Sequence, residues 1–148
     1  MHDLPRKLSV EQLAELFEGR TRFVERLAEL DDPVAHARAV AATLSDDEKR
    51  EVLDAHPPIG AQPALLSPLS VAEQGADDDP AILAELAELN RAYEERFGFR
   101  FVVFVNRRPK REIVPILRAR LKRPREQELD TALDELIQIA EDRWLRRS

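Results

Sequence analysis

Residues 80–105 read PAILAELAELNRAYEERFGFRFVVFV, and this stretch decides the fold class. Its first part repeats apolar residues at helical spacing, which predicts a helix that begins at Pro80 and ends near Phe97. Gly98 stands where a left-handed cap would end that helix. Phe99–Val105 is aromatic and β-branched and predicts an extended segment, but the chain contains no second strong strand to pair with it. We expect an all-α fold with one short, isolated extended segment at about residues 99–105.

Capping patterns predict helices in the first third of the chain. Ser9 with Gln12 and Ser45 with Glu48 each match a capping box, in which two side chains satisfy backbone N–H groups reciprocally. Apolar residues at helical spacing follow each serine, and Pro33 stands where a proline opens a helix. The predicted helices of this region are Ser9–Phe17, Phe23–Leu30, Pro33–Leu44 and Ser45–Ala55.

Two prolines set the predicted helices near the C-terminus. Pro115 does not suit a deep helical position, so we expect that helix to start near Ile113 and to run to Leu121. Pro124 opens the last helix. The predicted buried stripe of that helix is Leu129, Leu133, Leu136, Ile137, Ala140 and Trp144. The whole chain, residues 1–148, is predicted to be a single compact domain of seven to eight helices.

The composition excludes several kinds of site and partner. The 148 residues include 23 basic and 29 acidic side chains, so the net charge of −6 does not suit a general polyanion binder. The absence of cysteine removes disulfides, thiolate zinc sites and cysteine nucleophiles. His2, His36 and His56 are too scattered for an obvious metal site. No apolar run approaches the roughly 20 residues of a membrane helix, and no signal peptide is evident, so we expect a cytoplasmic protein without a membrane partner.

A proline-rich connection between Ala55 and Pro80 contains the first candidate functional residue. Connections of this length in a compact domain are usually functional or disordered. His56 opens the connection, and Pro57 fixes the backbone behind it. Histidine titrates near neutral pH, which suits a general acid or base. The same histidine also suits a helix C-terminal cap.

Ser70, Glu73 and Gln74 lie near the end of the same connection. Their Ser-x-x-Glu spacing matches a third capping box. Because His56 lies at the other end of the connection, Glu73 and His56 can alternatively face each other across a cleft. There they would hold a small substrate between a proton donor and a hydrogen-bond acceptor.

Arg143 and a basic segment complete the candidates. Arg143 lies beside the apolar stripe of the last helix, where it needs an anionic partner, either a structural carboxylate or the carboxylate of a ligand. Residues 107–125 contain nine basic residues and one acidic residue, a local charge of +8 (9 − 1). Such a segment is either a solvated face that pairs with acidic neighbours or a phosphate-contacting surface.

Spaced motifs run through most of the chain. They are His56-Pro57-x-Ile59-Gly60, Ser70-x-x-Glu73-Gln74, Leu89-Asn90-x-x-Tyr93-x-x-x-Phe97-Gly98-Phe99-x-Phe101-Val102, Arg125-x-x-Glu128 and Glu135-x-x-x-Ile139-x-x-x-Arg143. Their order and spacing resemble those of the 2-oxo-4-hydroxy-4-carboxy-5-ureidoimidazoline (OHCU) decarboxylase family. This is the enzyme of uric acid degradation in purine metabolism that makes S-allantoin. Arg22 departs from the pattern, since a bulky apolar residue is expected there.

The resemblance implies an all-α, cytoplasmic homodimer that uses no metal or organic cofactor and acts on a small ureidoimidazoline. It implies that His56 and Glu73 are catalytic, with His56 the proton donor and Glu73 holding the substrate hydroxyl or ureido group. The implied substrate-binding residues are Pro57, Ser70, Gln74, Phe101, Val102, Val103, Phe104, Val105 and Arg143. Two alternatives remain: a helical module that binds RNA or an acidic partner through the 107–125 face, and a ureide-binding family member without activity.

Overall fold

Capping boxes begin two of the helices, as predicted. The Ser9 hydroxyl accepts a hydrogen bond from the backbone N–H of Gln12 at 3.1 Å, and the Gln12 side chain accepts one from the backbone N–H of Ser9 at 2.9 Å. Ser45 and Glu48 form the same reciprocal pair. The structure, a computed structural model, describes residues 7–57 and 79–146. The helices in these ranges are α1 (Val10–Phe17), α2 (Arg22–Leu27), α3 (Pro33–Ala41), α4 (Asp46–Asp54), α6 (Pro80–Phe97), α7 (Lys110–Arg120) and α8 (Arg125–Arg146).

Helix α6 has the predicted bounds and the predicted cap. Gly98 follows it with a φ of 80°, and its N–H donates to the Glu94 carbonyl at 2.9 Å. Glycine adopts this left-handed conformation without the steric penalty that other residues meet. The following residues, 99–105, belong to no helix, and the described part of the chain contains no strand. The prediction of an all-α fold with an unpaired extended segment is therefore confirmed.

The predicted start of α7 is wrong. This helix begins at Lys110 rather than near Ile113, so Pro115 lies inside it. A proline in a helix interior costs about 3 kcal/mol. However, Ile113, Val114 and Leu117 of α7 are all buried. A fully buried apolar side chain contributes roughly 1.5–3 kcal/mol. Burial of these three side chains therefore outweighs the cost of the proline.

Helices α2 and α3 are shorter than predicted, ending at Leu27 and Ala41.

Arg22 is the first residue of α2, and its backbone N–H donates to the Glu51 carboxylate at 2.9 Å. The Arg22 Nε atom lies 3.4 Å from the same carboxylate. An ion pair with α4 therefore occupies the position at which an apolar residue is expected.

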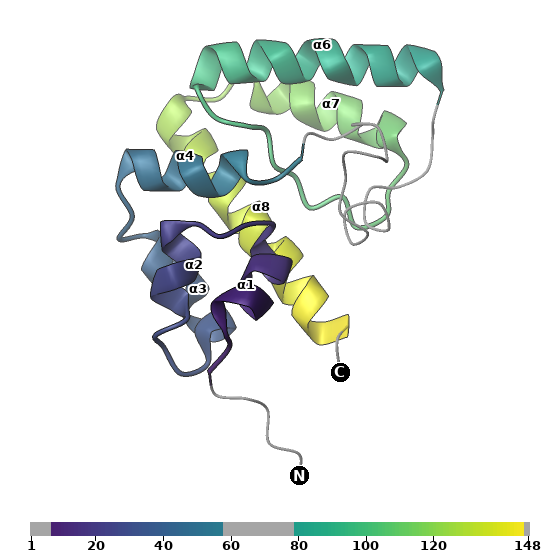
Figure 1. Cartoon of the computed structure of the whole chain (residues 1–148). Helices are drawn as coiled ribbons and strands as arrows, with labels where there is room; N and C mark the ends of the chain where they lie inside the picture. The colour runs from purple at the N-terminus through teal and green to yellow at the C-terminus, as the bar shows by residue number, and fades with distance from the viewer. Residues whose placement is uncertain (1–6, 58–78, 147–148) are drawn as a thin grey trace.

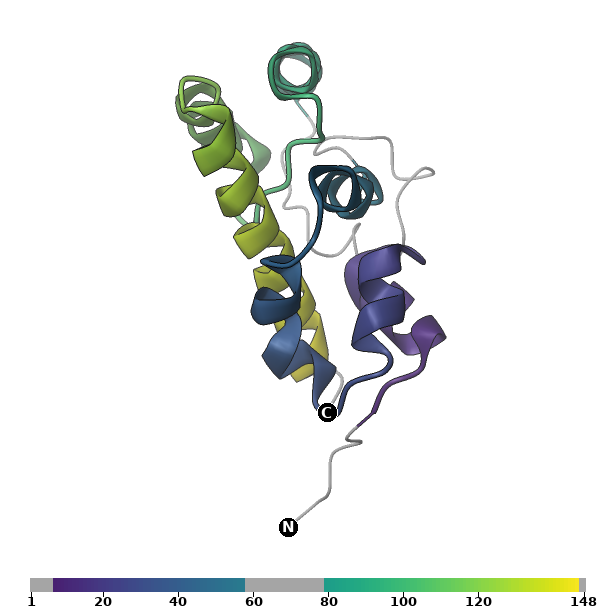
Figure 2. The ribbon, with the colours of Figure 1, turned by 90° about the vertical axis from the view of Figure 1, so that its left-hand side faces the viewer.

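Helix α8 is the element around which the fold is organised. It runs diagonally across the molecule and packs against α1, α3 and α4 (Figure 1). The view in Figure 2 shows α4 and α6 nearly end-on beside it. The predicted stripe of α8 is buried except for Trp144, which is only half-buried. Arg143 is buried along with the stripe, at 3% exposure.

Candidate active site

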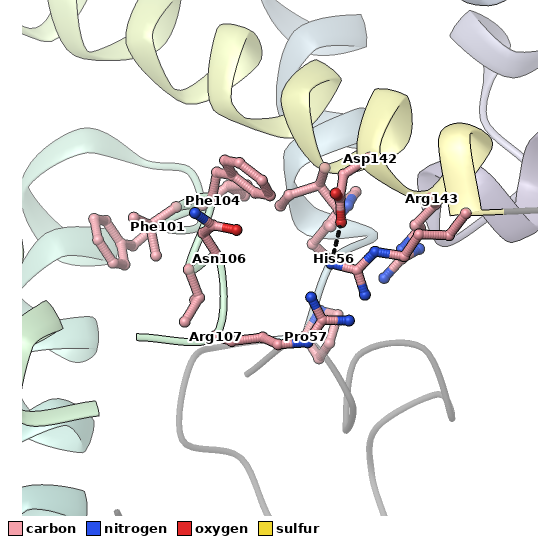
Figure 3. A pocket seen from close by; sticks show the side chains of 13 residues that line it. His56, Pro57, Phe101, Phe104, Asn106, Arg107, Asp142 and Arg143 are labelled. Atoms are coloured by element: carbon pink, nitrogen blue, oxygen red, sulfur yellow. Dashed lines mark ion pairs between the residues drawn. The ribbon is translucent and has the colours of Figure 1, made fainter. Parts of the chain in front are cut away.

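A pocket lies where the end of α4, the extended segment and the C-terminal half of α8 meet (Figure 3). Its empty volume is about 550 Å³, including space open to solvent. The residues that line it are His56, Pro57, Phe101, Val102, Val103, Phe104, Val105, Asn106, Arg107, Ile139, Asp142, Arg143 and Arg146. Residues that are far apart in the sequence therefore line one pocket.

His56 is held at the carboxyl end of α4. Its backbone N–H donates to the Leu53 carbonyl at 3.2 Å, and its carbonyl accepts from the Arg100 guanidinium at 2.6 Å. The residue is 4% exposed, and neither ring nitrogen has a well-aligned hydrogen-bond partner among the described residues. A buried polar group without a partner is unfavourable, and such groups are found at catalytic sites. The ring is thus positioned by the backbone of His56, and neither nitrogen makes a well-aligned hydrogen bond with the described residues.

The pKa of His56 is lowered from its ordinary value of 6.5 to about 4, and burial is the largest cause. The positive charge of Arg143 is the second cause and Arg100 contributes less, while Glu18 and the Val52 carbonyl act in the opposite direction. Both the low-dielectric surroundings and a neighbouring cation disfavour the imidazolium. In the ligand-free pocket His56 is therefore neutral at physiological pH.

Arg143 has a structural carboxylate as its partner. Its guanidinium donates to Glu18 Oε1 at 2.8 Å and to the carbonyls of Glu15 and Leu16 at 2.9 and 3.2 Å. These carbonyls lie at the carboxyl end of α1, where a cation is favoured by the helix dipole. Arg143 therefore joins α8 to α1, and it does so at the wall of the pocket that contains His56.

Hydrogen bonds from charged side chains, rather than from a neighbouring strand, hold the extended segment in position. The Glu135 carboxylate accepts from the backbone N–H of Phe104 at 2.9 Å, and the Arg120 guanidinium donates to the Val102 carbonyl at 2.8 Å. Arg120 in turn forms a fully buried ion pair with Glu128. The hydroxyl of Tyr93 donates to the same carboxylate at 2.5 Å. Tyr93, Arg120 and Glu128 are all buried, so their hydrogen bonds are protected from water and fix the backbone of the pocket wall.

The structure brings together all the predicted site residues that it describes. They are His56, Pro57, Phe101–Val105 and Arg143. Ser70, Glu73 and Gln74 lie outside the described residues, so their predicted roles remain predictions.

Sequence reasoning missed five residues of the pocket, namely Asn106, Arg107, Ile139, Asp142 and Arg146. One signal was available: Ile139, Asp142, Arg143 and Arg146 are spaced so that they lie on one face of a helix. Arg146 lies 2.6 Å from Asp142, the ion pair drawn in Figure 3. No sequence signal pointed to Asn106, and Arg107 was expected only as part of the basic segment 107–125, not as part of a pocket.

Most of the basic segment is used within the fold. Arg108 donates to the Phe104 and Val105 carbonyls. The ion pairs are Arg118 with Glu85, Arg120 and Arg123 with Glu128, and Arg125 with Asp46. This is the pattern of a face that pairs with its own acidic neighbours, and it does not favour an RNA-binding surface.

Within residues 7–57 and 79–146, no group of three or more histidine or acidic side chains is arranged to hold a metal ion. In the same ranges, no helix combines the length and the apolar character needed to cross a membrane.

The fold and the pocket define an all-α protein with a histidine-containing site for a small molecule. The family model for OHCU decarboxylase matches residues 2–145. The chain therefore belongs to the OHCU decarboxylase family.

Individual relatives agree with this assignment. The chain is 27% identical over 131 residues to the 2-oxo-4-hydroxy-4-carboxy-5-ureidoimidazoline decarboxylase of Haloferax volcanii, covering 86% of this chain and 78% of that protein. It is 32% identical over 141 residues to the uric acid degradation bifunctional protein of Bacillus subtilis. That match covers 95% of this chain but only 23% of the longer protein.

Two solved structures share the fold. A crystal structure of OHCU decarboxylase in the presence of (S)-allantoin superposes with a TM-score of 0.74 at 25% identity, covering 92% of this chain and 95% of that one. A crystal structure of (S)-allantoin synthase superposes with a TM-score of 0.68 at 26% identity. This second match covers 93% of this chain and 48% of that one.

Proposed function

We propose that this protein is a carboxy-lyase of uric acid degradation that converts OHCU to S-allantoin without a cofactor. The observation that carries the proposal is the pocket itself. It combines a buried histidine, whose ring nitrogens make no well-aligned hydrogen bond with the described residues, a wall of extended backbone and several arginines. A decarboxylase that acts on an anion and returns a proton to carbon requires a proton donor, an orienting surface and positive charge.

The chemistry does not need an external electron sink. The bond between the ring carbon and the carboxylate breaks, carbon dioxide leaves, and the electron pair moves into the adjacent imine-like bond of the ring. Protonation of one face of the resulting carbanion equivalent then gives one enantiomer of allantoin. The protein must orient the scissile bond, stabilise the charge that develops in the ring and deliver the proton to one face. Preorganised donors aimed at developing charge contribute about 3 kcal/mol each in other enzymes.

His56 is the proposed proton donor, and its low pKa in the ligand-free pocket has a consequence for the mechanism. A neutral imidazole is a much weaker acid than the imidazolium, so efficient proton donation requires the ring to be protonated first. The substrate carries a carboxylate, and a negative charge in the pocket opposes the effect of Arg143 on His56. We propose that the proton reaches His56 together with the substrate, so that the donor is charged only when the anion is present.

The other roles follow the family resemblance. Arg143 contacts the anionic substrate from the α8 side of the pocket, and the backbone of Phe101–Val105 binds polar atoms of the ring. Glu73 holds the hydroxyl or ureido group, and Ser70 and Gln74 bind the ring as well. These last three roles rest on the motif alone.

A cytoplasmic homodimer is also part of the proposal. The family resemblance supports the dimer, and light scattering of the purified protein at micromolar concentration tests it. A monomer over that range would contradict it.

The function is tested by adding the protein to freshly generated OHCU and following the circular dichroism of allantoin. We expect the S enantiomer to appear faster than in the slow, racemic background reaction. A wild-type protein that only binds the ureide, and leaves the background rate unchanged, would be the silent family member. That result would contradict the proposed function.

A further inference from the structure

Three arginines line the pocket, and they differ in their surroundings. Arg143 is buried and hydrogen-bonded to Glu18 at 2.8 Å, and Arg146 lies 2.6 Å from Asp142. Arg107 is exposed and forms no hydrogen bond or ion pair with any part of the chain that the structure describes. Among these three cations, Arg107 is therefore the one whose charge no described carboxylate neutralises.

The backbone directs Arg107 towards the pocket. Asn106 and Arg107 have φ angles of 51° and 60°, so two consecutive residues that are not glycine are left-handed. This conformation costs a residue with a side chain roughly 1–2 kcal/mol. Strained residues of this kind persist where neighbouring contacts hold them, and they are common at binding sites.

Arg108 supplies the contacts that hold this turn. Its backbone N–H and its Nε donate to the Val105 carbonyl at 3.1 and 2.9 Å, and another guanidinium nitrogen donates to the Phe104 carbonyl at 2.7 Å. Arg108 thus folds back on the extended segment, whereas the Arg107 side chain extends across the pocket towards Pro57 (Figure 3). Two adjacent arginines have different functions: one holds the turn, and the other presents its charge to the cavity.

We propose that Arg107 binds the substrate carboxylate at the mouth of the pocket and makes the site selective for an anionic ureide over a neutral one. This inference rests on the proposed function. The planar guanidinium matches a carboxylate in two parallel hydrogen bonds. Once carbon dioxide has left, the product has no carboxylate for Arg107 to hold. The same residue therefore favours capture of the substrate and release of the neutral product.

Steady-state kinetics of two variants test the proposal. Arg107→Gly removes the side chain and accepts a φ of 60° without strain, and Arg107→Gln removes only the charge. Both are expected to raise KM about tenfold at low ionic strength, because a charged hydrogen bond is lost. The kcat is expected to stay within about twofold, and the KM difference should shrink as salt screens the charge.

Arg91→Gln is the matched control, since Arg91 is an exposed arginine of α6 that does not line this pocket. It should keep the wild-type KM. The melting temperature of Arg107→Gly should not fall, because the strained residue has been replaced by glycine. An unchanged KM in both Arg107 variants, or an equal rise in Arg91→Gln, would overturn the proposal.

A binding measurement separates this inference from the proposed function. Ureidoacetate carries a ureido group and a carboxylate, and its amide lacks the charge. In an NMR titration, the wild-type protein should bind ureidoacetate about tenfold more tightly than the amide, and Arg107→Gly should lose most of this preference. Equal preference in the two proteins would contradict the role of Arg107 even if turnover is normal. If OHCU is not turned over, the proposed function fails, and the titration still decides what Arg107 recognises.

Discussion

The guanidinium of Arg143 lies 2.8 Å from the carboxylate of Glu18, at the wall of the pocket that contains His56. Both side chains are largely buried, at 2% and 12% exposure, so the pair is poorly screened by solvent. Its members act on His56 in opposite directions, Arg143 lowering and Glu18 raising the pKa of the ring. This ion pair therefore joins α1 to α8 and places two opposing charges near the proposed proton donor, whose pKa is lowered chiefly by burial.

Arg143→Lys should affect both stability and substrate binding. Lysine keeps the charge but loses the planar fork that reaches Glu18 and two backbone carbonyls of α1. We expect the free energy of unfolding to fall by about 2 kcal/mol and KM to rise several-fold. Glu18→Gln is the control, since it breaks the ion pair but leaves the guanidinium, and it should lower the melting temperature without the rise in KM. A lowered melting temperature with wild-type kinetics in Arg143→Lys would remove Arg143 from the substrate site.

The depressed pKa of His56 should make stability depend on pH. The unfolded chain has a histidine pKa of 6.5, whereas the folded value is about 4. Between these values the unfolded state binds a proton that the folded state does not, so stability falls as the pH falls through this window. At about 1.4 kcal/mol per pKa unit, the loss is about 3 kcal/mol. Urea titrations of the wild-type protein and His56→Gln give the difference between their free energies of unfolding at each pH. The change in that difference from pH 7 to pH 4 measures the loss due to His56. A difference that does not vary with pH would contradict the low pKa.

The pH dependence of turnover should show when His56 gains its proton. For the free protein, kcat/KM reports the pKa of His56 before substrate binds, whereas kcat reports the pKa in the complex. If the protonated ring is required, kcat/KM should fall with rising pH above about 4, and kcat should remain constant to a higher pH. Initial rates over pH 5–8 at several substrate concentrations separate the two profiles. A kcat/KM that is flat across this range would instead show that the neutral ring is the active form.

Glu73→Gln distinguishes a catalytic residue from a helix cap. Glutamine keeps the shape and can still accept a hydrogen bond from the Ser70 backbone, so a capping residue should lose only tenths of a kcal/mol of stability. A catalytic carboxylate predicts a large loss of kcat at a nearly unchanged melting temperature. Equal activity of variant and wild type would favour the cap.

Local signals allowed much of this fold to be predicted from the sequence. The capping boxes at Ser9 and Ser45 and the left-handed Gly98 are decided by neighbouring residues, and all three are present as predicted. The extended segment was also predicted correctly, because no second strand could pair with it. The start of α7 was predicted incorrectly. Burial of Ile113 and its neighbours against the core outweighs the preference of Pro115 for the first turn of a helix.

The site was predictable to the extent that its residues stand in spaced motifs. His56, the extended segment and Arg143 share one pocket, although no local signal joins them. The partners of these residues were not predictable. Glu18 is 125 positions from Arg143 in the chain, and only the packing of α1 on α8 brings them together. The left-handed turn at Arg107 escaped prediction because arginine carries no preference for it.

The central claim, that His56 supplies the proton in an OHCU decarboxylase, is tested most directly by the rate at which S-allantoin forms. Freshly generated OHCU is mixed with wild-type protein, His56→Ala or His36→Ala, and the circular dichroism of allantoin is followed. His36 is an exposed histidine of α3 outside the His56 pocket, so its variant controls for loss of a histidine as such. We predict wild-type rates for His36→Ala and a rate lower by roughly 10²–10⁴ for a folded His56→Ala, the usual contribution of a general acid. A folded His56→Ala that forms S-allantoin at the wild-type rate would contradict the account.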